Sequence, residues 1–449
     1  MSLREFLKLV EKEDKVLHVR DQVSTDFEVS NVMKNFDNEG PILLFERVKD
    51  YETKIVANVC GTRKRICKAL NVNQDGLYGR LIEAWRPSKK ARIVSDGVVK
   101  EVVEKTVDLS RIPILTHFGK DAGPYITSAV IHAKSFDEEI ENVSVHRLQV
   151  LDKKHVAIRL VPRHLFKLWS MAKAKGKDLD IAISVGVHPA VLLAASSSAP
   201  FGVNEFDVAN MLLNDGLRLI DCEHVNASAP ADTELVLEGK ISATKEVTEG
   251  PFVDITGTYD IQRTQPLVEI IGAMHRENYV YEALLPSGAE HRLLMGLPHG
   301  VLIWDSVSKV VPKVGAVNLS VGGCGWLHAI ISVEKQVDGD AKNALLAAFA
   351  AHPSLKHAVV VDPDIDVFNV DDVEWAIATR FQAGEDLVVI PNVRGSTLDS
   401  SADQETGLTT KVGFDATRSL AKPKEKFERA CIPANERIEK LSSKLRSSM

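Results

Sequence analysis

The chain has 449 residues, and its 45% hydrophobic and 26% charged residues are typical of a globular protein of two or three domains. A formal net charge of −7 argues against nucleic acid or an anionic membrane as a partner, because both favour a concentrated basic face. No apolar run approaches the ~20 residues that span a bilayer, no signal-peptide core begins the chain, and the cysteines form no CxxC pair. We therefore expect a cytoplasmic protein without a disulfide framework.

The first 110 residues have the pattern of a compact α/β domain. Apolar residues recur at helical spacing over 3–10 and 21–36, β-rich runs follow at 42–45 and 54–59, and a helix is expected over 62–70. The segment from Trp85 to Ile114 is predicted to be a connection with a short hairpin around Val98–Val103. We place the end of this domain, residues 1–110, beside Ile112-Pro113.

The middle of the chain changes to short β runs separated by turn residues. Helices are expected over 163–175 and 204–214. Strands are expected at 126–132, 148–151, 155–161, 180–187, 234–243, 266–275 and 300–305. This pattern predicts a split, barrel-like β domain over residues 111–315.

After the glycine cluster Gly322–Gly325 the chain returns to alternating helices and strands. The expected elements are helices over 341–351 and 370–380 and strands over 357–361 and 387–390, followed by a charged helical tail from Pro433 to Ser448. We predict a third, α/β domain over residues 316–449 that contributes a subunit contact. The whole chain is therefore expected to have a mixed α/β (α+β) fold.

One hexad carries an unusual density of polar groups for a β-rich region. It reads Asn142-Val143-Ser144-Val145-His146-Arg147 and holds an amide, a hydroxyl, an imidazole and a guanidinium between two apolar runs. Taken alone, a solvated strand edge explains it. Asn142, His164 at the start of one helix and Glu205 at the start of another would suit Mn²⁺ or Mg²⁺ better than zinc. Ordinary satisfied polar groups remain the alternative.

Two further features suit an anion or an acid. The loop with Ser196, Ser197 and Ser198 could hold a phosphate, with Lys411 as a candidate cation, although a serine-rich linker explains the loop equally well. Glu249 and Asp254 flank a Gly-Pro turn. Arg147 could hold one of these carboxylates ionised while burial favours the protonated form of the other. An exposed acidic hairpin is the alternative, and no Walker, GxSxG or HExxH motif is present.

Together these features resemble the UbiD-type decarboxylases, which include ferulic acid decarboxylase and the 3-octaprenyl-4-hydroxybenzoate decarboxylases. The resemblance extends over essentially the full length. It is carried by Asn142 with Arg147, Pro162-Arg163-His164, Gly202–Glu205, Glu234–Gly239 and Glu249–Phe252.

The resemblance implies reversible, non-oxidative decarboxylation through a covalent adduct with prenylated FMN. Asn142, His164 and Glu205 would hold Mn²⁺ (or Mg²⁺) against the cofactor phosphate, with K⁺ nearby. Arg147 and Glu249 would tune Asp254, the proton donor, which stands where ferulic acid decarboxylase has Glu. The implied cofactor contacts are Asn142, Val143, Ser144, Val145, His146, Arg147, Arg163, His164, Ser196, Ser197, Ser198 and Lys411.

The substrate class stays open between heteroaromatic acids, hydroxybenzoates and an α,β-unsaturated aliphatic acid such as an isoprenoid precursor. His291 and His299 are candidate pocket residues, and the direction of the reaction is undecided. A flavin prenyltransferase would supply the cofactor to a homodimer or homohexamer. The competing hypotheses are a flavin- or nucleotide-binding module without decarboxylase activity, which would not need Glu249 and Asp254, and a structural assembly subunit.

Overall fold

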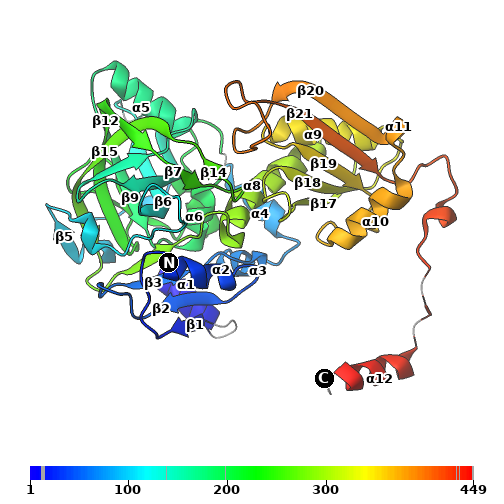
Figure 1. Cartoon of the computed structure of the whole chain (residues 1–449), viewed down its shortest axis with the longest axis horizontal. Coiled ribbons are helices and arrows are strands. Elements are labelled where there is room, and N and C mark those ends of the chain that lie inside the picture. Colours follow the sequence, from blue (N-terminus) through cyan, green and yellow to red (C-terminus); the bar gives the residue numbers. More distant parts are fainter. Residues whose placement is uncertain (12–15, 138, 198, 431, 434, 447–449) are drawn as a thin grey trace.

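The computed structural model describes residues 1–11, 16–137, 139–197, 199–430, 432–433 and 435–446. Figure 1 shows a blue N-terminal unit beneath a cyan and green β-rich unit, with a yellow and orange α/β unit beside them. This mixed α/β fold agrees with the prediction. Among the described residues, no helix combines the length and apolar character that crossing a bilayer requires.

The N-terminal unit is a four-stranded sheet covered by helices, as the apolar spacing predicted. In α1, for example, Leu3, Phe6 and Val10 are buried one turn apart. Its helices are α1 (Leu3–Glu11), α2 (Glu28–Asn35), α3 (Arg63–Ala69) and α4 (Leu77–Ala84). Its strands, in sheet order, are β1 (Val16–Val19), β2 (Ile42–Phe45), β3 (Lys54–Ala57) and β16 (Val280–Ala283). The last of these comes from far along the chain and pairs parallel to β3.

The hairpin predicted within the connection after Trp85 is wrong. Val98–Lys100 forms a 3-10 turn between β4 (Arg92–Ile93) and β5 (Val102–Glu104), and these strands pair with the central unit instead of with each other. Val99 is fully buried beside Ile220 and Met274, so apolar burial fastens this segment onto the central unit.

The central unit is a closed antiparallel barrel, which refines the predicted split sheet. Its six strands run in the order β12, β9, β6, β7, β8, β15, and β12 pairs with β15 to close the ring. The strands are β6 (Tyr125–Lys134), β7 (Glu141–Val150), β8 (His155–Ile158), β9 (Leu179–Val185), β12 (Leu235–Glu249) and β15 (Arg263–His275). Outside the ring lie α5 (His164–Ala174), α6 (Pro189–Ala195), α7 (Glu205–Leu212), β10 (Arg218–Asp221) and β11 (Ser228–Pro230).

A strand predicted over Gly300–Asp305 is also wrong, because these residues belong to the long helix α8 (Ala289–Val307). The buried residues Leu294, Leu297 and Val301 recur at helical spacing, which outweighs the local β-like run. Glycine at 296 is required by packing, since a Cβ there would lie 2.7 Å from the carbonyl oxygen of Gly325.

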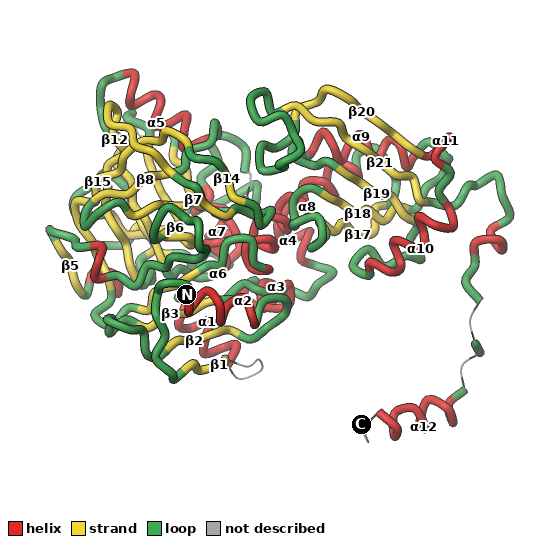
Figure 2. Tube along the Cα trace, in the orientation of Figure 1, coloured by secondary structure: helices red, strands yellow, loops and turns green. Residues whose placement is uncertain are grey.

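The C-terminal unit is a five-stranded sheet with helices against it. The sheet order is β17 (Val314–Leu319), β18 (His328–Val333), β19 (His357–Val361), β21 (Leu408–Ala416) and β20 (Leu387–Arg394). The helices are α9 (Asp340–Ala351), α10 (Val370–Arg380) and the short α11 (Ala383–Asp386). The tail then leads to α12 (Glu436–Arg446), which stands clear of the body in Figures 1 and 2.

Candidate functional site

Arg147 on β7 lies at the centre of a buried ion-pair network. Its side chain is 8% exposed. Nε and Nη2 donate to the two carboxylate oxygens of Glu249 at 2.9 and 3.0 Å, and Nη1 donates to Asp254 Oδ2 at 2.7 Å. The guanidinium also packs against Phe252, 4.9 Å from the ring centroid. The arginine and the two carboxylates singled out from the sequence therefore meet.

Local backbone geometry explains how Glu249 and Asp254 converge. Glu249 is the last residue of β12, and Gly250 turns the chain at a φ of +89°, where side chains are disfavoured. The chain continues into a ribbon of β13 (Phe252–Val253) and β14 (Tyr259–Asp260), and Asp254 follows β13. Both carboxylates thus return to the same guanidinium.

Electrostatics keep Arg147 charged. Burial alone would lower the pKa of Arg147, but Glu249, Asp254 and Asp260 outweigh it and raise the pKa above its usual range. Glu249 is fully buried and also accepts from the Tyr125 hydroxyl at 3.3 Å. A buried arginine with these partners is a fixed cation at any physiological pH.

A second polar cluster uses the opposite face of β7. Side chains alternate along a strand, so Asn142 points away from the face that carries Arg147. The Asn142 amide donates to both oxygens of Glu205 at 3.3 and 3.4 Å, and the backbone N–H of Val143 donates to Glu205 at 2.7 Å. Ser144 Oγ lies 3.0 Å from Asn142 Oδ1.

The chemistry of Glu205 fits a bound cation. Its side chain is 2% exposed, and no Lys or Arg of the described residues forms an ion pair with it. Burial raises the pKa of Glu205 to about 8, although Val143 and Asn142 favour the ionised form. A divalent metal would take the place of that proton, as carboxylate ligands require.

His164, the third predicted ligand, is the first residue of α5. Burial, followed by the charges of Arg163 and Lys167, lowers the pKa of His164, which favours the neutral imidazole that metals bind. In the described part of the chain no three His, Cys, Asp or Glu side chains form a metal-binding group. The predicted ligands include two such side chains, His164 and Glu205, and the third ligand is the amide of Asn142. An imidazole, a carboxylate and an amide oxygen are donor types that fit Mn²⁺ or Mg²⁺.

The described hydroxyls of the serine loop bond to the backbone of α6. Ser196 Oγ donates to Leu192 O at 2.8 Å and Ser197 Oγ donates to Ala194 O at 2.6 Å, both on α6. Hydroxyls that donate inward present lone pairs outward, and the contact of this loop with a phosphate stays a prediction. Ser198 lies outside the described residues.

Lys411 is occupied within the C-terminal unit. It is 4% exposed, and its Nζ donates to the carbonyl oxygens of Pro353 and Leu355, both at 2.7 Å. Burial lowers the pKa of Lys411 to about 8. In this arrangement the ammonium group already holds two acceptors, and its contact with a phosphate stays a prediction.

The two candidate pocket histidines of α8 lie in different surroundings. His291 accepts from Ser287 N at 3.1 Å. Burial lowers the pKa of His291, and the charge of Asp254 opposes that change. His299 instead packs edge-on against Trp326 and at a tilt against His352 of the C-terminal unit, with ring centroids 4.5 and 4.6 Å apart.

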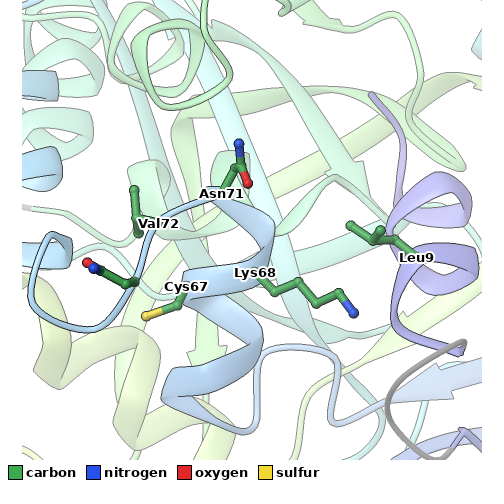
Figure 3. A pocket seen from close by; sticks show the side chains of 6 residues that line it. Leu9, Cys67, Lys68, Asn71 and Val72 are labelled. Carbon is green, nitrogen blue, oxygen red and sulfur yellow. The ribbon is translucent and has the colours of Figure 1, made fainter.

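Sequence reasoning missed Asp260, whose Oδ2 accepts from Arg147 Nη2 at 2.9 Å. Its one available signal was Arg263 three residues later, a common spacing that singles out nothing by itself. A surface hollow between α1 and α3 was also unforeseen. Figure 3 shows Leu9, Cys67, Lys68, Asn71 and Val72 around it, and none of these residues belongs to the Arg147 or Glu205 clusters.

Comparison with known proteins identifies the class. The fold of the whole chain is that of UbiD-class enzymes. Three family models match consecutive segments: the 3-octaprenyl-4-hydroxybenzoate carboxy-lyase N-terminal domain over residues 7–85, the Rift-related domain over 92–289 and the C-terminal domain over 292–416. The chain belongs to the UbiD family, which confirms the resemblance drawn from its motifs.

Individual relatives cover nearly the whole chain. Anhydromevalonate phosphate decarboxylase of Methanothermobacter thermautotrophicus is 42% identical over 95% of this chain and 99% of its own length. The UbiD-class enzyme HmfF from Pelotomaculum thermopropionicum, solved with FMN, is 40% identical with a TM-score of 0.94, covering 97% of this chain and 98% of its own. An evolved dimeric form of HmfF, solved with prFMN, is 39% identical with a TM-score of 0.90, covering 96% and 97%.

Proposed function

We propose that this chain decarboxylates, reversibly and without net oxidation, an α,β-unsaturated or (hetero)aromatic carboxylic acid with the help of prenylated FMN. The observation that carries the proposal is Arg147 held between Glu249 and Asp254. A buried acid–arginine–acid group gives a flavin-binding module no advantage, whereas a decarboxylase needs a proton donor in a controlled charge environment. The FMN and prFMN complexes of HmfF support the choice of cofactor.

Asp254 is the carboxyl group best placed to deliver a proton. Its side chain is 20% exposed, against 0% for Glu249 and 5% for Asp260, so it is the member of the network that a substrate can reach. It accepts a single bond from Arg147, whereas Glu249 accepts two. We therefore assign Glu249 and Arg147 to orientation and charge control, and Asp254 to protonation of the carbon that has lost CO₂.

Asn142 and Glu205, together with His164, would hold a divalent metal against the phosphate of the flavin. Loss of CO₂ from an sp² carbon leaves an electron pair that the carbon cannot carry alone, and prenylated FMN supplies the electron sink. Ser196 and Ser197, whose hydroxyls donate inward, offer oxygens to a nearby monovalent cation.

Among the open substrate classes we favour the α,β-unsaturated aliphatic acids. The support is the set of archaeal relatives, five of which are anhydromevalonate phosphate decarboxylases at 37 to 42% identity. His291, on which the charge of Asp254 acts, is the candidate contact for a polar group on the substrate.

The test is production of the protein together with a flavin prenyltransferase, followed by absorption and mass spectra of the bound flavin. A panel of anhydromevalonate phosphate, furan and pyrrole carboxylates and 4-hydroxybenzoate is then assayed for CO₂ release. We expect bound prenylated FMN and turnover of anhydromevalonate phosphate above the aromatic acids. Flavin binding with no CO₂ release from any acid would instead favour the binding-module hypothesis.

A further inference from the structure

Asp260 is the carboxylate that the expected acid network does not include. It ends β14, opposite Phe252 in the small ribbon, and its side chain is 5% exposed. Its Oδ2 accepts from Arg147 Nη2 at 2.9 Å and lies 3.6 Å from Arg159 Nε. Its Oδ1 accepts from Arg263 Nη2 at 2.9 Å. Asp260 therefore joins Arg147 to two further arginines.

The enlarged network is balanced in charge. It contains three carboxylates and three guanidinium groups: Glu249, Asp254 and Asp260 with Arg147, Arg159 and Arg263. Burial would raise the pKa of Asp260, but Arg147, Arg263 and Arg159 outweigh it and hold the pKa below its usual range. Asp260 is thus a permanent negative charge within the group.

This balance matters for the proton on Asp254. A carboxyl group beside an uncompensated guanidinium is held ionised, yet a donor must carry its proton before it can give it away. Nη2 of Arg147 is shared between Glu249 and Asp260, and only Nη1 faces Asp254. The positive charge near Asp254 is therefore largely offset from the other side of the arginine.

We propose that Asp260 is a positioning residue that fixes Nη2 of Arg147 and offsets the guanidinium charge, so that Asp254 can carry the proton the reaction consumes. The inference rests on the function proposed above, in which Asp254 is the donor. It gives a role to a residue outside the acid–arginine–acid group that the family resemblance implies.

Charged and titratable groups from several elements lie around Arg147 and Asp254. Arg147 on β7 binds Asp254 directly, Glu249 on β12 and Asp260 on β14 bind the same guanidinium, and the charge of Asp254 acts on His291 of α8. Asp121, before β6, accepts from the backbone N–H of Val253, the residue before Asp254. Among the described residues, the side chains of Glu249 and Asp260 are the ones that accept from Arg147 besides that of Asp254. Of these two, Asp260 also accepts from Arg263. A negative charge can therefore be removed at Asp260 and a positive charge at its partner Arg263, which changes the charge of the network in opposite directions.

The experiment follows the protonation of Asp254 directly. Infrared difference spectra of the flavin-free protein over a pH series detect the C=O stretch of protonated carboxyl groups, and the band that Asp254→Asn lacks belongs to Asp254. Asp260→Asn leaves one surplus positive charge in the network, so the pH midpoint of the Asp254 band should fall by roughly one pH unit. Arg263→Gln leaves one surplus negative charge, so the midpoint of the Asp254 band should rise by a similar amount.

Two variants separate charge from damage. Asp260→Glu restores the charge and should return the midpoint towards the parent value. Asp362 is about as buried as Asp260 and forms an ion pair with Arg380 in the C-terminal unit, with 2.6 Å between Asp362 Oδ2 and Arg380 Nη1. Asp362→Asn removes that charge and should leave the midpoint of the Asp254 band unchanged. Damage to the fold alone would not move the midpoint in opposite directions.

The outcomes are distinct. Unchanged midpoints in both Asp260→Asn and Arg263→Gln would overturn the inference, whether or not the protein decarboxylates anything. If Asp260→Asn fails to fold, as judged by circular dichroism, Arg263→Gln and Asp260→Glu decide the matter. Full turnover by Asp254→Asn would refute the assignment of the donor, and the coupling of Asp260 to Asp254 would still be measured.

Discussion

Asp254→Asn keeps the shape of the side chain and its hydrogen bond to Arg147 but carries no proton to donate. We expect turnover to fall at least a hundredfold, the lower range for losing a general acid, while flavin and metal contents stay unchanged. The measurement is CO₂ release per bound flavin, with metal content by mass spectrometry.

The matched control for this variant is Asp180→Asn, which removes an aspartate bound to Lys240 Nζ at 2.5 Å on the same barrel, outside the Arg147 network. It should keep near-parent turnover. Parent-like activity of Asp254→Asn would move the donor to Glu249 or to a water held by His291.

Glu205→Gln tests the metal site through stability. In the parent, Mn²⁺ should raise the unfolding temperature of flavin-free protein, because a ligand that binds only the folded state stabilises it; at 100 times its Kd the gain is about 2.7 kcal/mol. The variant cannot supply the carboxylate and should show little shift. Glu246→Gln, which changes a carboxylate of β12 that pairs with Lys173, should respond to Mn²⁺ as the parent does. Equal shifts in all three proteins would exclude Glu205 as a ligand.

At the scale of single residues, the sequence predicted the members of both clusters better than their contacts. The alternation of β7 explains why: Asn142 and Arg147 lie on opposite faces, so one hexad serves the Glu205 cluster and the Glu249 cluster. Asp260 was beyond reach, since its contact with Arg147 spans 113 residues and depends on closure of the barrel. The inward hydrogen bonds of Ser196 and Ser197 likewise appear only once α6 exists.

The helix α8 and the C-terminal unit meet at His299, Trp326 and His352, and this junction should be sensitive to acid. Burial lowers the pKa of His299 to about 4 and that of His352 to about 2. Both rings are neutral when folded but bind protons below pH 6.5 when unfolded, so stability is full above that pH and is lost as pH falls towards these values.

We expect this junction to contribute a loss of about 2–3 kcal/mol between pH 6.5 and 5, measurable by urea unfolding at each pH. His352→Gln keeps a donor for the carbonyl of Trp326, which His352 holds at 3.0 Å, and should remove part of the loss. His155→Gln, at the start of β8 and away from this junction, should not remove any of it. Identical acid dependence of His352→Gln and the parent would contradict this account.

For elements, the periodic segments were predicted well and the ambiguous one was not. The helices α1, α5, α7, α9 and α10 follow clear 3.6-residue patterns. Residues 300–305 form an apolar run that is too short to distinguish a strand from part of a helix. The helix is stabilised by the close packing of Gly296 against Gly325 and by the buried apolar residues of α8.

At the scale of the whole molecule, helix α12 carries an uncovered apolar stripe. Ile438, Leu441 and Leu445 recur at helical spacing and are 51%, 48% and 59% exposed. We propose that α12 packs through this stripe on a second copy of the chain. Truncation after Cys431 should therefore lower the oligomeric mass measured by light scattering.

Point variants separate contact from truncation. Leu441→Asp places a charge in the stripe and should weaken assembly, whereas Ser443→Asp, on the other side of the helix, should not. If the truncated chain keeps the full-length mass, α12 is not part of the subunit contact. The domain limits at residues 110 and 315 stay predictions that limited proteolysis could examine.

The parallel pairing of β16 with β3 affects how the chain folds during translation as well as how stable the folded sheet is. Until Ala283 has left the ribosome, β3 lacks its neighbour, and the sheet keeps an open edge of the kind that recruits other chains. More than two hundred residues separate Ala57 from Ala283, so at roughly 5–20 residues per second the nascent chain spends on the order of 10 s or more in this state. The first sheet to be translated is therefore completed only after the barrel, and the nascent N-terminal segment is where chaperones have most reason to bind.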